Sequence, residues 1–225
     1  MDDVKRRRML LWPVLTAIVA LSAVWLLRPA SPNDLTDASR LQLLSLARRQ
    51  LEALVLNSAT VTLDDVDLPR DLRTPGSAFV TLRGPDGELR GCMIDRFDAH
   101  ESLAENVLRN VAYAFSDDRF APISPAELEE TTIEISVLSE PTVLAFDSPE
   151  GLVRQLTPGV DGVILRTDDG VSTFLPYVWE ELADPELFLS ELCLKQGLPA
   201  DRWRTVPYPT IETYRVDSFA EIPHD

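Results

Sequence analysis

The sequence predicts an α+β fold with a mainly antiparallel sheet and flanking helices, in a single compact domain behind an N-terminal transmembrane helix. Segments with apolar residues every three or four positions, typical of helices, interleave with segments of alternating apolar and polar residues, typical of half-buried strands. Two pairs of strand-like segments are joined by tight turns, Pro85-Asp86-Gly87 and Asp168-Asp169-Gly170. Strands joined by such short turns are antiparallel, because a parallel pair needs a much longer crossover connection.

The first segment predicted is a membrane anchor. A basic tail (residues 1–8) precedes an uncharged run from Met9 to Leu27, and a short linker (28–34) follows. At ~1.5 Å rise per residue a helix over this run nearly spans the ~30 Å hydrocarbon core of a bilayer. A cleaved signal peptide is the alternative, but the run is longer than a usual signal h-region and no small-residue cleavage site follows it.

The charges that flank this run predict its orientation. The cluster Lys5–Arg8 lies before the run, and one arginine and then acidic residues follow it. Basic residues favour the cytoplasmic side, so we expect a single-pass protein with the N-terminus cytoplasmic and the body outside, periplasmic in a Gram-negative cell. A body that faces the cytoplasm is the alternative.

The predicted body spans residues 35–220, and its first half contains a helix, a hairpin and a second helix. Apolar residues at helical spacing (Leu41, Leu44, Leu51, Leu54 and Val55) predict a helix that ends near Asn57. Residues 67–77 are expected to form a loop. Residues 78–93 alternate around the Pro-Asp-Gly turn and predict a hairpin, and residues 102–117 predict the second helix.

The second half of the body begins with a strand. Residues 131–139 alternate, with Ile133, Ile135 and Val137 on one buried face. Ser148 followed by Pro149 is a helix-start signal, and Gly197 is a helix-end signal. We therefore expect a short helix at 148–156, a second hairpin at 162–176, helices at 176–182 and 185–197, and one last strand at 210–219.

Charge and composition exclude several function classes. The formal net charge of −16 argues against nucleic acid or an anionic lipid surface as the main partner. Two cysteines and two histidines provide neither a disulfide framework nor a Cys/His zinc cluster, so we predict no metal and no cofactor, although a metal held by carboxylates alone stays open. His100 is expected to be a polar residue at a helix entry, and Cys193 a core residue.

The stretch Leu89–Asp95, LRGCMID, is the candidate site. Strand alternation places Arg90 and Cys92 on one face, close enough for the guanidinium to favour a thiolate. Gly91 between them is expected to expose backbone to a ligand or a neighbouring chain, with Asp95 at the rim. The alternative is sheet packing, because free cysteine is among the most buried residue types. No histidine is placed by the sequence to act as a base, so no catalytic dyad is predicted.

Six ordered blocks carry a resemblance to a known family: FVTLRGPDGELRGC, AFSDDRFAPIS, ELEETTIEISVLSEP, PGVDGVIL, STFLPYVWEEL and FLSELCLKQGL. Together they resemble the AMMECR domain, protein A of the AmmeMemoRadiSam system, over roughly Leu35 to Ala220. The resemblance implies a compact α+β domain, an association with Memo-like and radical-SAM proteins, and no established reaction. It also implies that the family hallmark Leu-Arg-Gly-Cys-Ile-Gly lines a surface cleft.

The match to that hallmark is partial. Leu89 to Cys92 agree, Met93 replaces isoleucine, and Ile94-Asp95 stands where the family has its closing glycine. The resemblance adds Arg119, from the family's Asp-Pro-Arg-Phe stretch, and Thr173, from its Thr-Phe-Leu-Pro block, to the candidate binding residues. Asp118 replaces the proline of the former stretch.

Three function classes follow. We favour a binding or accessory module that acts with a Memo-like or radical-SAM partner, because no activated nucleophile or phosphate loop is visible. The second class is an enzyme that uses Cys92 as a thiolate, with Arg90 tuning it and Asp95 or Glu88 handling protons. The third is a membrane-tethered structural protein.

Overall fold

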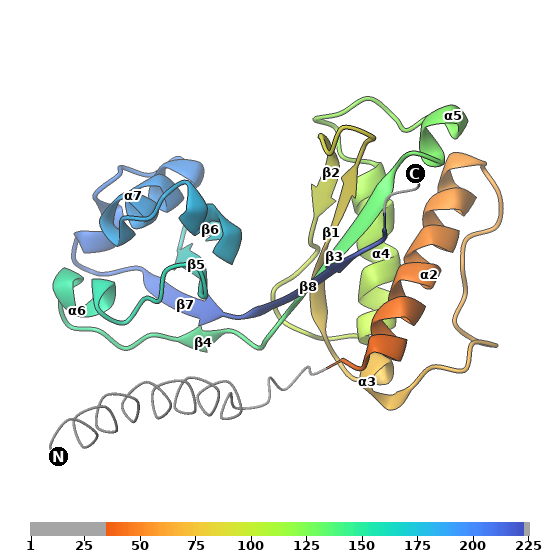
Figure 1. Cartoon of the computed structure of the whole chain (residues 1–225). Helices are drawn as coiled ribbons and strands as arrows, with labels where there is room; N and C mark the ends of the chain where they lie inside the picture. Colours follow the sequence, from red (N-terminus) through yellow and green to blue (C-terminus); the bar gives the residue numbers. More distant parts are fainter. Residues whose placement is uncertain (1–34, 223–225) are drawn as a thin grey trace, which may run out of the picture. The chain divides into compact units, whose positions relative to one another are not determined.

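The computed structural model describes residues 35–222, which belong to one compact unit (Figure 1). The predicted tail, membrane span and linker lie outside the described residues. Among residues 35–222 no helix is long and apolar enough to cross a membrane. The longest helix within residues 35–222 is α2 (Asp37–Val55), and its 19 residues include charged ones such as Arg48 and Glu52. The predicted membrane localisation, with the body outside the cytoplasm, is therefore corrected.

The first sheet has the strand order β2-β1-β3-β8, and every neighbouring pair is antiparallel. Its strands are β1 (Ser77–Arg83), β2 (Leu89–Met93), β3 (Thr132–Leu138) and β8 (Val216–Ala220). The helices α2 and α4 (Leu103–Phe115) cover one face of this sheet (Figure 1). Short helices α3 (Arg70–Arg73) and α5 (Pro125–Leu128) lie in its connections. The predicted hairpin at 78–93 is thus confirmed as β1 and β2.

Capping residues determine where the two long helices begin. Thr36 accepts a hydrogen bond from the Ser39 backbone N–H, and Ser102 forms a capping box with Glu105. Each cap satisfies backbone N–H groups that a helix start leaves without partners. Leu41, one of the apolar residues whose spacing predicts this helix, is 68% exposed and lies on the outer side of α2.

The second sheet has the order β4-β7-β5-β6 and is also antiparallel. Its strands are β4 (Thr142–Val143), β5 (Gly162–Thr167), β6 (Gly170–Phe174) and β7 (Thr210–Tyr214). Around it lie α6 (Pro149–Val153), the 3₁₀ helices η1 (Pro176–Glu180) and η2 (Arg202–Arg204), and α7 (Pro185–Lys195). Its core includes Trp179, which stacks on Phe188 with ring centroids 3.7 Å apart.

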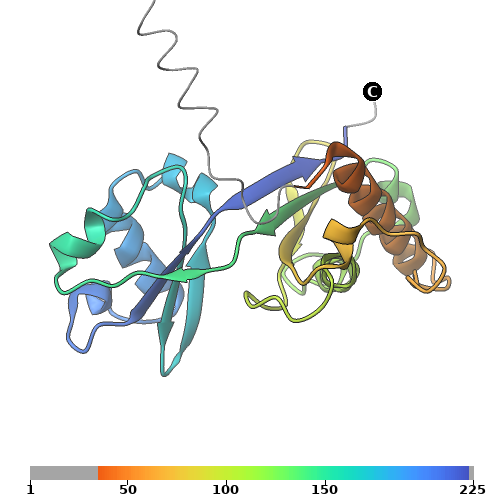
Figure 2. The ribbon, with the colours of Figure 1, turned by 90° about the horizontal axis from the view of Figure 1, so that it is seen from below.

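The predicted last strand is in fact two strands in two different sheets. β7 pairs with β4 and β5 of the second sheet, and after Arg215 the chain continues as β8, which pairs with β3 of the first sheet. Figure 2 shows the chain passing directly from one sheet into the other. A third apolar cluster, centred on Phe79, Leu138, Ile164 and Tyr214, packs residues of both sheets together. The predicted single sheet is therefore replaced by two sheets that share this cluster.

Candidate functional site

Cys92 lies at the contact between the two sheets. Met93 packs into the core beneath α2 and α4, whereas Cys92 packs with the cluster that joins the sheets. Its neighbours in that cluster include Phe97 from the loop after β2 and Leu175 from the end of β6. The thiol is half-buried and accepts a hydrogen bond from the Thr81 hydroxyl at 3.3 Å. Cys92 therefore occupies the sheet face opposite the helices, with part of its surface open to solvent.

Gly91 has a different role from the one the sequence predicts. The residue is buried, and a Cβ built on it would lie 2.1 Å from the Ala114 carbonyl oxygen of α4. Only a residue without a side chain lets helix and strand approach this closely. Gly91 thus exposes no backbone to a ligand, and instead it fixes the depth at which α4 packs on β2.

Asp117 and Arg119 brace the free edge of β2 beside Cys92. The Asp117 carboxylate accepts the Cys92 backbone N–H at 3.2 Å and the Arg119 side chain at 2.6 and 2.8 Å. Arg119 in turn donates to the Cys92 carbonyl at 3.2 Å. The hydrogen bonds from Arg119 lower the pKa of Asp117 to about 2, against a desolvation effect that raises it. The carboxylate is therefore ionised at neutral pH and fully occupied by its donors.

Arg90 does not approach the thiol as the sequence predicts. Its guanidinium donates to Glu127 at 2.6 Å and to the Ala121 carbonyl at 3.1 Å. The ion pair links the start of β2 to α5, and the arginine side chain is largely buried. Arg90 consequently stabilises the fold near the site, and its charge is already balanced.

Two side chains from the helices around the second sheet, Lys195 of α7 and Tyr177 of η1, lie within electrostatic range of Cys92, and the sequence did not single them out. The Lys195 ammonium, at the end of α7, donates to the Thr173 carbonyl at 2.9 Å and lies 5.0 Å from the centre of the Phe174 ring. Lys195 is exposed as a whole residue, yet the pKa of its ammonium is lowered, mainly by desolvation. The positive charge of Arg119 lowers this pKa as well, whereas negative charge on Cys92 raises it. The ammonium is therefore within electrostatic range of both Cys92 and Arg119.

Tyr177 of η1 is the other side chain. Tyr177 is 64% exposed as a whole residue. Desolvation nevertheless raises the pKa of its phenol, and negative charge on Cys92 raises it as well. Arg83, which forms an ion pair with Glu134 at 3.2 Å across β1 and β3, lowers that pKa. We call Thr81, Cys92, Arg119, Tyr177 and Lys195 together the Cys92 face.

Thr173 contacts the Cys92 face only through its backbone carbonyl, which accepts the hydrogen bond from Lys195. Its hydroxyl is buried between the Val163 carbonyl at 2.8 Å and the Tyr214 hydroxyl at 2.9 Å. Burial raises the pKa of Tyr214, so its hydroxyl stays protonated and available for this contact. The side chain predicted as a binding residue is thus a structural contact inside the second sheet. Cys193 is buried in the core as expected.

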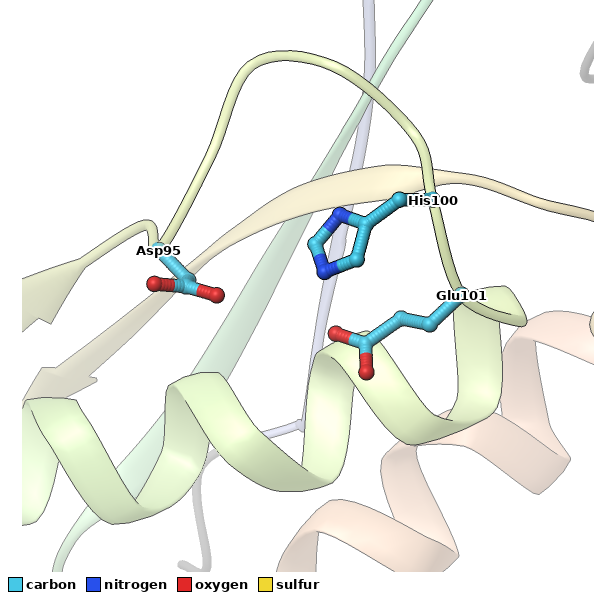
Figure 3. A group of neighbouring side chains, drawn as sticks. All are labelled: Asp95, His100 and Glu101. Carbon is cyan, nitrogen blue, oxygen red and sulfur yellow. The ribbon is translucent and has the colours of Figure 1, made fainter.

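Asp95 belongs to a separate group in the loop before α4. Asp95, His100 and Glu101 point toward one another (Figure 3), and their ligand atoms all lie within 4.8 Å of one another. Two carboxylates and an imidazole are a donor set that suits a divalent cation. However, Arg109 already forms ion pairs with both carboxylates, at 3.5 Å from Asp95 and more closely with Glu101. A cation would have to displace this guanidinium, so the group is explained by its present ion pairs.

Sequence reasoning missed Lys195 and Tyr177 because no local pattern connects them to Cys92. Tyr177 stands in the block STFLPYVWEEL, where it resembles one more aromatic residue of a helix, and Lys195 ends an ordinary helical segment. The signal for Asp117 was available, since it matches the family stretch that also contains Arg119. Only the packing of the two sheets brings these residues to the thiol.

Comparisons with known proteins agree with this architecture. The AMMECR1 family model matches residues 44–219. The chain is 38% identical over 173 residues to a protein of Thermofilum pendens, covering 72% of this chain and 80% of that protein. It is 35% identical over 179 residues to protein TK0174 of Thermococcus kodakarensis, covering 77% and 84%.

A solved structure is also similar. The crystal structure of the uncharacterized protein PH0010 from Pyrococcus horikoshii matches with a TM-score of 0.76 and 30% sequence identity, over 84% of this chain and 94% of that one. The family match covers both sheets and every residue of the Cys92 face. The resemblance that the ordered motifs indicated is thereby confirmed, and the chain belongs to the AMMECR1 family.

Proposed function

We propose that this chain is a binding module that recognises a ligand or partner protein at the Cys92 face. The observation that carries the proposal is the position of Cys92, a half-exposed thiol in the cluster that joins the two sheets, with the Thr81 hydroxyl donating to its sulfur and Arg119 donating to its carbonyl. Such a surface combines an apolar floor with a few oriented polar groups, as binding sites commonly do.

The contacts near Cys92 favour binding over catalysis. The sequence assigned proton transfer to Asp95 or Glu88, but the Asp95 carboxylate pairs with Arg109 and the Glu88 carboxylate accepts the Asp86 backbone N–H at 3.1 Å. A general base has to reach the proton that it removes, directly or through one water. Neither carboxylate has a contact with Cys92 among the hydrogen bonds of residues 35–222, so the enzyme alternative has no assigned proton acceptor.

The partner class in this proposal comes from the family resemblance. A Memo-like or radical-SAM protein would dock against the Cys92 face, with Tyr177 as an exposed aromatic anchor. Tyrosine is enriched among the residues that dominate binding energy at protein interfaces. The exposed ring of Tyr177, next to the ion pair of Arg83 and Glu134, fits this role.

The test measures binding of the full chain to the purified Memo-like and radical-SAM proteins encoded in the same genome. We expect Tyr177→Ala to weaken binding by tenfold or more, which is about 1.4 kcal/mol or above. Leu41→Ala is the matched control, since Leu41 is similarly exposed but lies on the outer side of α2. Equal affinities of the wild-type chain and Tyr177→Ala would contradict the site, and no binding to either protein would contradict the partner class.

A further inference from the structure

We propose that the free edge of β8 is an interface between two copies of this chain. Each copy pairs its β8 with the β8 of the other, so that their first sheets join into one continuous antiparallel sheet. The proposal goes beyond the proposed function, because β8 ends the first sheet on the side opposite β2, the strand that carries Cys92. With β1 and β3 between these two strands, pairing at β8 does not use the edge of β2.

Two backbone hydrogen bonds at the ends of the β3–β8 pair show which residues of β8 bond to β3. The Ser139 N–H donates to the Arg215 carbonyl at 2.8 Å, and the Glu221 N–H donates to the Ile133 carbonyl at 3.0 Å. In an antiparallel pair the hydrogen-bonded residues alternate along each strand. Every second residue of β8, in phase with Arg215 and Glu221, therefore bonds to β3.

The residues in the other phase, Val216, Ser218 and Ala220, direct their backbone N–H and C=O groups away from β3. Within the part of the chain that the structure describes, no other hydrogen bond reaches these outward backbone groups. The Ser218 hydroxyl shares a hydrogen bond of 2.8 Å with the hydroxyl of Ser136 on β3, which leaves the backbone of Ser218 free for another strand. The outer edge of β8 is thus a row of unpaired donors and acceptors.

The other free edges of the two sheets are short or covered. The side chains of Asp117 and Arg119 bind the backbone of β2 at Cys92, and Lys195 binds a backbone carbonyl of β6. β4 has only two residues and follows Pro141. β8, in contrast, has five residues, with no lysine, no proline and no break in its register with β3. Proteins usually protect an edge of this kind, so β8 is the edge that a partner strand can extend.

One antiparallel register between two copies of β8 pairs all three outward-facing residues. It is centred on Ser218, which lies opposite the Ser218 of the second copy, and it places Val216 opposite Ala220. Residues that pair in this way exchange both of their backbone hydrogen bonds. The same patch then serves on both copies, as a two-fold interface requires.

The charges of the strand favour the same register. Asp217 lies opposite the Phe219 of the second copy, and just beyond the strand ends Arg215 lies opposite Glu221. A shift that centres the pair on Asp217 places two carboxylates directly opposite each other, and a shift to Phe219 places Asp217 opposite Glu221. Like charges directly opposite destabilise an antiparallel pair. The strand is therefore complementary to itself in the one register that uses its whole edge.

A disulfide tests this register in the full chain. In a hydrogen-bonded antiparallel pair the Cα atoms lie ~5.5 Å apart, a separation that a disulfide can span. We therefore expect mild oxidation of Ser218→Cys to give a disulfide-linked dimer, with the two residue-218 peptides joined in mass spectra. Ala220→Cys is the matched control, because Ala220 is exposed like Ser218 but its two copies would lie about 13 Å apart along the strands.

Sedimentation of the full chain tests whether this edge holds the dimer. The wild type should show a monomer–dimer equilibrium at about 0.15 M salt, which screens the repulsion between two chains of net charge −16. Ser218→Lys places two ammonium groups opposite each other and should weaken association roughly fivefold or more. Thr142→Lys, on the exposed strand β4, is the matched control and should leave it unchanged. Ser218→Ala should also keep the dimer, which separates the charge from the lost hydrogen bond to Ser136.

Each outcome decides for or against the proposal. A wild-type chain that stays monomeric would overturn it, and so would a dimer that Ser218→Lys leaves unchanged, because another surface would then hold the two copies together. Cross-linking of Ala220→Cys in place of Ser218→Cys would overturn the register. The wild-type measurement and the Ser218→Cys cross-link need no charged substitution, so they decide the question even if Ser218→Lys impairs folding.

Discussion

Replacing Asp117 by asparagine should destabilise the domain, and the cost should depend on pH. The carboxylate is almost completely buried and accepts four hydrogen bonds, from the Arg119 backbone and side chain and from the Cys92 backbone. An asparagine amide would direct an NH₂ group at one of these donors. Asp117→Asn thus removes a charge partner of Arg119 and leaves a donor beside β2 without an acceptor.

The expected loss of stability in Asp117→Asn can be worked out from the pKa of Asp117. The fall from the ordinary value of 3.8 to about 2 corresponds to about 2 kcal/mol of stability at neutral pH. Because the folded-state pKa lies below the unfolded one, this stability is present above about pH 4 and is lost as the pH falls toward 2. The unsatisfied donor adds to the cost, so we expect a loss of about 2–4 kcal/mol at pH 7.

The assay is urea unfolding at pH 7 and near pH 3, followed by the fluorescence of the buried Trp179 and Trp203. Near pH 3 the ionised Asp117 carboxylate should have lost roughly half of its contribution to the free energy of unfolding. The difference in the free energy of unfolding between the wild type and Asp117→Asn should therefore shrink by about 1 kcal/mol. Asp118→Asn is the matched control, since this neighbouring carboxylate is exposed. A gap that does not change with pH, or an equal cost for Asp118→Asn, would refute the reasoning.

Four further predictions concern packing and reactivity. Gly91→Ala should cost about 1–3 kcal/mol in urea unfolding, because its Cβ would lie 2.1 Å from a carbonyl oxygen of α4, and an unchanged midpoint would contradict that close approach. Arg48→Met should lower the free energy of unfolding by about 3–5 kcal/mol, because Arg48 pairs with a largely buried glutamate and donates to two backbone carbonyls. A melting temperature equal to that of Arg73→Met, which changes an exposed arginine, would contradict this prediction. Native alkylation, read by mass spectrometry, should modify Cys92 well before the buried Cys193, whose pKa burial raises, and equal rates would exclude the assigned exposures. Calorimetry of the domain should give one transition, because the cluster that joins the sheets couples them, and two separated peaks would show that they unfold independently.

The elements that depend on local signals were predicted well. Ser102 and Ser148 begin their helices as N-caps, and the turns at Gly87 and Gly170 join the strand pairs expected of them. These features need only neighbouring residues, because a cap or a tight turn is satisfied within a few positions of the chain. The ordered motifs likewise indicated the AMMECR1 family before any fold was known.

The features that depend on distant residues were not predicted. Residues 210–219 have one continuous strand pattern, and only pairing with two different partners divides them into β7 and β8. The predicted partner of Cys92, Arg90, is bound to Glu127 because α5 packs near the start of β2, which no local pattern indicates. Gly91 was expected to expose backbone, whereas the approach of α4 buries it.

By itself the sequence determined the α+β class, the positions of its hairpins and longer helices, and the motif that contains Cys92, because hydrophobic period, turn residues and caps act over short distances. The short helices α3 and α5 were not predicted, and α3 lies in residues 67–77, which were expected to form a loop. The tertiary structure decided what surrounds that cysteine. Lys195 and Tyr177 follow it by many residues along the chain, and they come within electrostatic range of it because the second sheet packs on the face of the first sheet that the helices leave uncovered. Packing between elements that are distant in sequence decides which side chains share a surface, and the local pattern of residues does not predict that packing.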